Sequence, residues 1–451
     1  MTERPTSIVS TLGHAAASLP RGQLLRAADD LLDRAARLDP ATLRRHQGRQ
    51  LALVLAHARA TVPFDRERLR AIRFDPERHD WAEVLRDVPP LDRARAQEVA
   101  PQLVSLDPPP GHAPNGYTLT SGSTGRPLRV LGTPAVALVN LALDRRFHRW
   151  WRRDPGRRAA IVTNVLDPAR GRPPDGDLAN GWFPGERCGE TRVLSVAVPI
   201  DQQLAWLGRL RPSYLVTFPS SAAELLRHAL RTGAPHPGVE HLCTSSEPVP
   251  EHLRALATLA WDVRVAATYS ASEVGPIAFE HPEGPGYFVQ AENVLVEVVD
   301  DAGRPCAPGE LGRVLITTLH NFAMPLVRYE LGDRAAWGAP WAGLPAHPVL
   351  ERVVGRVRHL ARLADGSRAW PYFRHDRLVR IAPFRQWQLV QSRPGEVVAR
   401  VVATRPLTDA ERAEVASVAC EFVPFDRVSV EEVAALPRGP GGKYEDFVSS
   451  C

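Results

Sequence analysis

Residues 118–127 read Thr118-Leu-Thr-Ser-Gly-Ser-Thr-Gly-Arg-Pro127, a turn crowded with hydroxyl groups and glycines. Glycines permit positive φ angles and let backbone N–H groups point inward around an anion, while Ser and Thr hydroxyls add donors for phosphate oxygens. No Gly-Lys-Ser/Thr follows, so the turn is not of the Walker type. The sequence predicts a phosphate-binding loop of another kind, although such a turn on its own is more often a plain flexible loop.

The sequence on either side of this turn falls into regions of different periodicity. From about Leu24 to Ala60, leucine and alanine recur at helical spacing, so we expect residues 1–110 to be a helical lead-in. From Pro127 to Ile277, β-prone runs alternate with helical stretches, which favours layered α/β structure with parallel strands. From Tyr287 to Val327, tight turns join strands, which indicates a β-rich subdomain.

The part of the chain after Gly355 has the pattern of a small α+β domain. It contains a hairpin signal at Asp365-Gly366, strands near 387–390 and 397–403, a helix from about Thr408 to Cys420 and a final strand. A chain of 451 residues is too long for one core. We therefore expect an α/β protein with a large N-terminal domain over 1–354 and a small mobile C-terminal domain over 355–451.

Composition excludes several classes of function. The net charge is +5, but the arginines are spread out and no basic block is interleaved with aromatic residues, so no nucleic-acid partner is expected. The N-terminus has no apolar signal core and the longest apolar stretch, near 135–143, is far short of a span, so no membrane partner is expected. The five cysteines form no Cys-x-x-Cys, which fits a cytoplasmic protein without disulfides or structural zinc.

Five motifs occur in the order found in the adenylate-forming superfamily, which includes acyl-CoA ligases, luciferases and peptide-synthetase adenylation domains. The turn at Thr120–Pro127 resembles the phosphate loop of that superfamily. The others are Thr268-Tyr-Ser-Ala-Ser-Glu273, Tyr329-Glu-Leu-Gly-Asp333, Gly355-Arg356 and Leu436-Pro-Arg-Gly-Pro-Gly-Gly-Lys443. Each motif alone is weak, but five in this order are specific, and the resemblance covers nearly the whole chain.

The resemblance implies a role for each motif residue. The phosphates of ATP would be bound by the turn, through Thr120, Ser121, Gly122, Ser123, Thr124 and Gly125. The nucleoside and the metal would be bound by the next two motifs, in which Tyr269 lies against adenine, Glu273 holds Mg²⁺ and Asp333 bonds the ribose. Further contacts would come from Thr268, Ser270, Ser272 and the hinge residue Arg356.

Two further features carry implied roles. Ser246, Glu247 and Pro248 resemble the loop that lies along the adenine base, although the same residues suit a cap and first turn for a helix from Glu251. Lys443 is the only lysine among 56 basic residues and stands where the superfamily has its adenylation lysine. A compact ammonium there would stabilise the charge that develops when a carboxylate attacks the α-phosphate.

Within the superfamily, the chain is most similar to the phenylacetate–CoA ligases and the related capsule-biosynthesis-type proteins. The run Thr317-Thr-Leu-His-Asn-Phe-Ala-Met-Pro-Leu-Val-Arg-Tyr329 resembles theirs, and Leu128 stands where many other acyl-CoA ligases have lysine. Two features depart from the pattern. Arg358 and His359 replace the usual hinge aspartates, which puts the domain rotation in question, and Trp337–Pro345 replaces a cysteine-rich zinc stretch, so we expect no zinc.

The resemblance implies an enzyme that uses ATP and Mg²⁺ to convert a small-molecule carboxylic acid to an acyl-adenylate and then transfers it to CoA. The acceptor is the weaker half of this prediction, and an amine or a carrier-protein thiol remains the alternative. A non-catalytic nucleotide-binding homologue is a third reading, and a homodimer is one admissible assembly. The acid pocket is expected around Phe218–Ser221, Thr244 and Ser270–Ser272. His148, Trp150 and Trp151 are further candidates for lining it, although residues of these types at this spacing are more often core residues.

Overall fold

The computed structural model describes residues 21–119, 128–163, 165, 167, 169–196, 198–354, 361–366, 368–369, 375–420, 423–436 and 447–451. The chain divides into two compact units. Unit 1 contains Met1–Arg157, Asn180–Gly189 and Ala266–Gly355, and unit 2 contains Arg158–Ala179, Glu190–Val265 and Arg356–Cys451. The domain boundary predicted at 354/355 stays a prediction, because residues 355–360 lie outside the described part of the chain.

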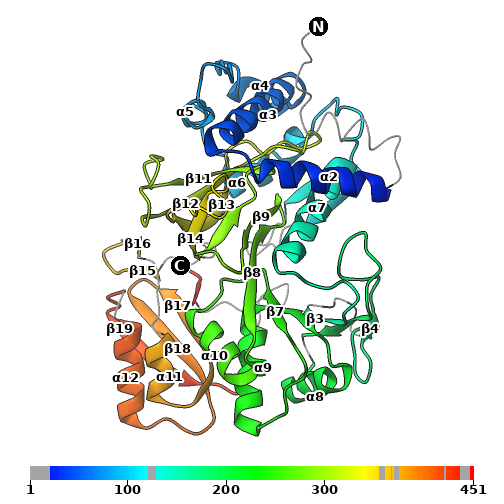
Figure 1. Ribbon diagram of the computed structural model, residues 1–451. Helices are drawn as coiled ribbons and strands as arrows, with labels where there is room; N and C mark the ends of the chain where they lie inside the picture. Colours follow the sequence, from blue (N-terminus) through cyan, green and yellow to red (C-terminus); the bar gives the residue numbers. More distant parts are fainter. Residues whose placement is uncertain are drawn as a thin grey trace. The chain divides into compact units, whose positions relative to one another are not determined.

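Helices occupy the start of unit 1 in the described residues, within the segment predicted to be a helical lead-in. The second of them begins at Pro40 because Asp39 caps it, with the carboxylate accepting from the backbone N–H of Thr42. Among the described residues, the helices of unit 1 are α2 (Arg21–Ala35), α3 (Pro40–Thr61), α4 (Pro63–Arg68), α5 (Trp81–Arg86), α6 (Arg93–Glu98), the short 3₁₀ helix η1 (Ala100–Leu103) and α7 (Pro134–Trp150). In Figure 1, α2 lies next to α7, and Asp29 of α2 accepts a hydrogen bond from Arg145 of α7 at 2.8 Å.

The strands of unit 1 form a hairpin and an antiparallel sheet. The hairpin consists of β1 (Gly116–Leu119) and β2 (Arg129–Gly132), with Leu119 opposite Arg129, so the two ends of segment 120–128 are neighbours. The sheet has the order β11-β12-β13-β14-β10-β9-β8. Its strands are β8 (Arg264–Ala271), β9 (Gly275–Glu280), β10 (Tyr287–Val289), β11 (Val294–Val299), β12 (Leu311–Thr318), β13 (Tyr329–Trp337) and β14 (Val349–Val354). The β-rich subdomain predicted from the turns is confirmed.

The first part of unit 2 is a layered α/β structure with helices packed on a mainly parallel sheet (Figure 1). The strand order is β7-β6-β3-β5-β4, and the pairs of β3 with β5, β3 with β6 and β6 with β7 are parallel, as predicted. The elements are β3 (Ala159–Thr163), β4 (Asp177–Leu178), β5 (Thr191–Ser195), α8 (Ile200–Leu210), β6 (Tyr214–Thr217), α9 (Pro219–Thr232), β7 (His241–Thr244) and α10 (Glu251–Trp261). Leu215, Leu225 and Leu242 join sheet and helices in one buried core.

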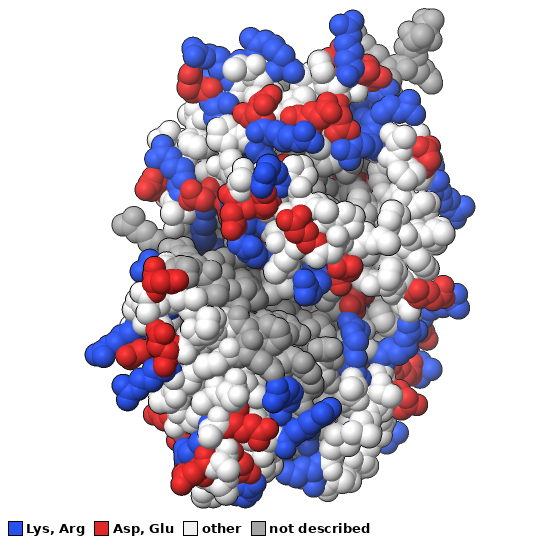
Figure 2. Space-filling view, turned by 90° about the vertical axis from the view of Figure 1, so that its left-hand side faces the viewer, with Lys and Arg blue, Asp and Glu red and all other residues white. Residues whose placement is uncertain are grey.

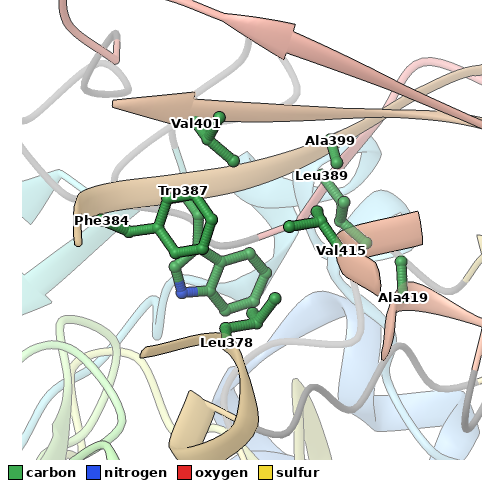
Figure 3. Close-up of a pocket in the computed structure, with 8 residues that line it drawn as sticks. All are labelled: Leu378, Phe384, Trp387, Leu389, Ala399, Val401, Val415 and Ala419. Carbon is green, nitrogen blue, oxygen red and sulfur yellow. The ribbon is translucent and has the colours of Figure 1, made fainter. Parts of the chain in front are cut away.

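The C-terminal part of unit 2 has its own sheet and core. The sheet has the order β19-β18-β17-β20, and α11 and α12 pack on it. Its elements are β15 (Ala361–Arg362), β16 (Arg368–Ala369), α11 (His375–Ile381), β17 (Phe384–Arg393), β18 (Glu396–Ala403), α12 (Asp409–Ala419), β19 (Arg427–Glu432) and β20 (Phe447–Ser449). Figure 3 looks into this core, where Trp387 and Phe384 of β17 face Leu378 of α11 and Val415 of α12 around a cavity of about 10 Å³. An apolar cavity this small is a packing gap rather than a ligand site.

The surface carries charges of both signs. On the face shown in Figure 2, basic and acidic side chains of the described residues are interspersed. Exposed pairs such as Arg49 with Glu77 and Arg95 with Glu98, each at 2.7 Å, illustrate this mixing. In the part of the chain that the structure describes, none of the helices has the length and apolar character that spanning a bilayer requires.

Candidate active site

Tyr269 of β8 and Asp333 of β13 are joined by a hydrogen bond in unit 1. The phenolic hydroxyl donates to the Asp333 carboxylate at 2.9 Å, and both side chains are buried. Gly332, directly before the aspartate, has a φ of +76°, a conformation that glycine adopts without strain and other residues rarely adopt. The structure therefore brings together the two residues to which the sequence assigns adenine and ribose.

Glu273 lies in the turn between β8 and β9, and its side chain is fully buried. Arg93, the first residue of α6, forms an ion pair with its Oε1 at 3.2 Å, and the hydroxyl of Tyr329 donates to the same oxygen at 3.4 Å. A buried carboxylate is costly unless it is paired, so these contacts help to hold Glu273 in place. Arg93 is a site residue that sequence reasoning missed.

A cavity of about 230 Å³ opens beside Glu273 within unit 1. Its walls come from the β1–β2 hairpin, α7, the turn after β8 and the segment from Thr318 to Asn321. The polar side chains on these walls include Asn140, Ser272, Glu273, His320 and Asn321. The carboxylate predicted to hold a metal thus borders a space that is large enough for a hydrated ion or part of a substrate.

Two uncharged acceptors on the cavity wall are buried. They are Oδ1 of Asn140 and Nδ1 of His320, and neither has a partner among the described residues. The other ring nitrogen of His320, Nε2, lies 2.8 Å from the carbonyl oxygen of Glu292. Burial lowers the pKa of His320 to about 4, and the hydrogen bond to Glu292 opposes this only in part, so the ring is neutral near pH 7.

These residues fit a magnesium ion better than a metal held by protein ligands alone. Among the described residues, no group of three or more His, Cys, Asp and Glu is arranged to bind a metal. Mg²⁺ is commonly bound by one or two carboxylates together with substrate phosphates, and it keeps several water molecules. A single carboxylate at the edge of a cavity with uncharged acceptors is consistent with that mode.

Ser246, Glu247 and Pro248 lie in unit 2, on the loop between β7 and α10. The Glu247 carboxylate accepts from the backbone N–H and the hydroxyl of Ser220 at 2.9 and 3.1 Å, so it caps the first turn of α9. Helix α10 instead has Pro250 as its N-cap, without a side-chain cap. The prediction that Ser246–Pro248 caps the helix from Glu251 is therefore wrong, and the role beside adenine stays a prediction.

The remaining predicted residues fall into three groups. Ser270 and Ser272 are exposed and Thr268 is half-buried along and just after β8. Trp151 is core, since its indole N–H donates to the carbonyl of Glu280 at 3.0 Å, and Phe218 is buried in the core of unit 2. The residues that lie outside the described part of the chain are Thr120, Ser121, Gly122, Ser123, Thr124, Gly125, Arg356 and Lys443.

Comparison with protein families gives one clear match. Residues 41–324, well over half of the chain, match the model of a family described as AMP-binding enzyme. The matched region contains the hydroxyl-rich turn, Tyr269 and Glu273. Asp333 lies just beyond it.

Known proteins that resemble the chain include one curated relative and several solved structures. A phenylacetate-coenzyme A ligase of Thermus thermophilus is 27% identical over 308 residues, so the match spans 64% of this chain and 65% of that relative, less than two thirds of its length. A 2-hydroxyisobutyryl-CoA ligase in complex with R3-HIB-AMP has a TM-score of 0.72 at 18% identity, covering 93% of this chain and 92% of its own. An anthranilate CoA ligase, AuaEII, in complex with anthranoyl-AMP has a TM-score of 0.53 at 16% identity, covering 77% and 68%. At these identities the solved structures establish the fold.

Proposed function

Because the chain belongs to the AMP-binding enzyme family, we propose that it activates a carboxylic acid with ATP to an acyl-adenylate and transfers the acyl group to coenzyme A. The observation that carries this proposal is that one unit holds both the Tyr269–Asp333 pair, joined by a hydrogen bond, and Glu273, whose side chain borders a cavity. The curated relative is named a phenylacetate-coenzyme A ligase, which supports CoA as the acceptor and an aryl or acyl acid as the substrate.

The first half-reaction joins the acid to AMP. A carboxylate oxygen of the acid attacks the α-phosphorus of ATP, the bond from that phosphorus to the bridging oxygen breaks, and pyrophosphate leaves. In this proposal Tyr269 and Asp333 hold the nucleoside, residues 120–125 bind the phosphates, and Lys443 stabilises the charge that develops on them. Mg²⁺, when bound at Glu273, neutralises part of the phosphate charge.

The second half-reaction releases AMP. The thiol sulfur of CoA attacks the carbonyl carbon of the acyl-adenylate, the bond from carbon to the phosphate oxygen breaks, and AMP leaves with that electron pair. An acyl-adenylate reacts with other nucleophiles as well, so the same first step would serve an amine or a carrier-protein thiol.

Arg93 has a positioning role in this scheme. Its ion pair with Glu273 fixes one oxygen of the carboxylate from the side of α6. Leu128 supplies no charge beside the phosphate loop, where many acyl-CoA ligases have lysine. Arg93 thus places a cation in contact with the predicted metal ligand, and it orients that ligand.

The proposal is tested by acid-dependent ATP–pyrophosphate exchange with a panel of aryl and acyl acids. We expect Lys443→Ala to lower the exchange rate by about a hundredfold or more while the circular dichroism of the protein is unchanged, because the charge in the transition state loses its ammonium. Lys443→Arg serves as the charge-conserving control and should recover only part of the rate, because guanidinium lacks the compact geometry. Near-normal exchange by Lys443→Ala would contradict the proposed role.

The acceptor is tested separately, by AMP release from the isolated acyl-adenylate complex. Release on addition of CoA, but not of amines or of a carrier protein with a free thiol, supports the ligase. Release only with an amine or a carrier-protein thiol would favour the alternative acceptors. Absence of acid-dependent exchange with every acid in the panel, despite ATP binding, would favour a non-catalytic nucleotide-binding protein.

A further inference from the structure

His320 presents a bare acceptor to the cavity because its other nitrogen is already used. A carbonyl oxygen accepts hydrogen bonds and cannot donate them, so Nε2, at 2.8 Å from the Glu292 oxygen, must carry the ring proton. In a neutral ring Nδ1 then has a lone pair and no hydrogen. Glu292 is itself held by Arg146 at 2.7 Å, deep in unit 1, and this fixes the backbone that orients the ring.

Asn140 is tied to the turn that carries Glu273. A Cβ atom on Gly275, two residues after the glutamate, would lie 2.8 Å from both amide atoms of Asn140, and Gly275 has a φ of +76°. The Asn140 amide therefore packs directly against this turn. Its buried Oδ1 makes no hydrogen bond with the described residues, although it lines the same cavity as Nδ1 of His320.

The polar groups that line the cavity indicate which kind of ligand it binds. Buried acceptors without partners are unfavourable unless something in the cavity donates to them. Beside a carboxylate, the best-matched donor is positively charged and offers hydrogens in several directions. A hydrated Mg²⁺ ion has this character, because it binds directly through one or two carboxylates and retains several water molecules whose hydrogens point outward.

We propose that His320 and Asn140 accept hydrogen bonds from the water molecules of a Mg²⁺ ion held by Glu273, so that the cavity binds the ion in its hydrated form. This inference rests on the proposed function, which supplies the ion and its nucleotide. It adds two positioning residues that act through the hydration shell and touch no reacting atom. Such outer contacts commonly change metal affinity by 10–100-fold.

Two substitutions of His320 test separately the acceptor at Nδ1 and the hydrogen bond that Nε2 donates to Glu292. In His320→Gln, the amide nitrogen can take the place of Nε2 and keep the bond to Glu292, but no acceptor remains at Nδ1. In His320→Asn, the amide oxygen takes the place of Nδ1, and the bond to Glu292 is lost. Asn140→Leu keeps the size of the side chain and removes its acceptor.

The measurement is binding of Mn²⁺ to the full-length protein with a non-hydrolysable ATP analogue, followed by electron paramagnetic resonance, with Mg²⁺ as competitor. We expect His320→Gln and Asn140→Leu each to weaken binding of both ions about tenfold. His320→Asn should bind within about twofold of the parent and lose thermal stability instead, since it breaks a structural hydrogen bond.

Unchanged metal affinity in His320→Gln and Asn140→Leu would overturn the inference, and so would equal weakening in His320→Asn and His320→Gln, because the lone pair would then be irrelevant. If either His320→Gln or Asn140→Leu fails to fold, the metal affinity of the other variant still tests the inference. Acid-dependent exchange by the parent protein distinguishes failure of this inference from failure of the proposed function. If the parent exchanges pyrophosphate and the variants bind metal normally, only the role of His320 and Asn140 is refuted. If the parent binds metal but does not exchange pyrophosphate, the proposed function is refuted.

Discussion

The hydroxyl group of Tyr269 donates a hydrogen bond to the buried carboxylate of Asp333, and this bond both stabilises the carboxylate and orients it. We expect Tyr269→Phe to lower the free energy of unfolding by about 1.5–3 kcal/mol, the range for a hydrogen bond to a charged group. The ATP concentration for half-maximal pyrophosphate exchange should also rise several-fold, because the carboxylate proposed to bond ribose loses one of the contacts that orient it. Chemical denaturation and exchange kinetics measure the two effects.

Tyr117→Phe is the matched control for the stability effect. Tyr117 is 53% exposed and stacks its ring under Arg129, and its hydroxyl makes no hydrogen bond with the described residues. Loss of that hydroxyl should leave the free energy of unfolding within about 0.5 kcal/mol of the parent. Equal destabilisation by both substitutions would show that the bond to Asp333 contributes nothing.

At the residue scale, motifs predicted Tyr269, Glu273 and Asp333, and the structure brings these side chains into one unit. Motifs gave no sign of Arg93, because it meets Glu273 across 180 residues of sequence and only the fold sets that contact. His320 lies within the motif at 317–329, but the sequence assigns it no role. Its proposed role depends on which ring nitrogen bonds to the carbonyl oxygen of Glu292, and only the fold sets that contact. Local pattern also misassigned Glu247, whose carboxylate caps α9 rather than the following helix.

Among the elements, α12 offers the cleanest test of a local signal. Thr408 and Glu411 form a reciprocal capping box at its start, with each side chain bonded to the other's backbone N–H. We expect Thr408→Ala to destabilise the helix by about 1 kcal/mol. Hydrogen exchange of the amides of residues 409–419 in the full-length protein should accelerate accordingly, while the amides of unit 1 are unaffected.

Thr404→Ala is the control for this element. Thr404 is exposed in the connection before α12, and its side chain makes no hydrogen bond with the described residues, although its backbone N–H donates to Pro383. The substitution should therefore leave exchange in α12 unchanged. Similar acceleration by Thr404→Ala and Thr408→Ala would mean that the capping box does not stabilise the helix.

Elements with a strong local signal were predictable, and those that depend on distant partners were less so. The helix at 409–419 and the strand pair β17 and β18 lie within a few residues of their predicted positions, because a cap and alternating apolar residues define them. The short strand β4 has two residues and exists through pairing with β5, so its own sequence carries little signal. Helices α5 and α6 have six residues each; Asp80 and Asp92 cap them, but so few residues show no clear helical period.

For the molecule as a whole, the fold predicted from the superfamily motifs is confirmed by the matched structures, and the family is confirmed as well. The compact units are assembled from three segments each, because the chain leaves unit 1 after Arg157 and returns to it at Asn180 and again at Ala266. Sequence periodicity predicts the successive helices and strands, but it does not show which distant segments pack into the same unit. Long-range packing of buried side chains determines that.

Unit 1 holds several buried or half-buried histidines that are neutral near pH 7. Burial lowers the pKa of His148 to about 3, aided by the nearby Arg153 guanidinium, and burial lowers the pKa values of His112 and His320 to about 4. In the unfolded chain the same rings titrate near pH 6.5. Below pH 6.5 the unfolded state therefore binds more protons than the folded state, so the stability that these rings contribute is complete above that pH and is lost as pH falls toward 4.

The substitution His148→Asn removes one of these titrating rings. Arg153 donates a hydrogen bond to Nδ1 of His148 at 2.8 Å, and the side-chain oxygen of Asn can replace Nδ1 as its acceptor. At pH 5 we expect the variant to take up about one proton fewer than the parent when it unfolds. Calorimetry in buffers of different ionisation enthalpy measures this uptake directly. The thermal midpoint of the variant should also fall less steeply than that of the parent between pH 7 and pH 5, and identical proton uptake in the two proteins would mean that His148 is already protonated in the folded state at pH 5.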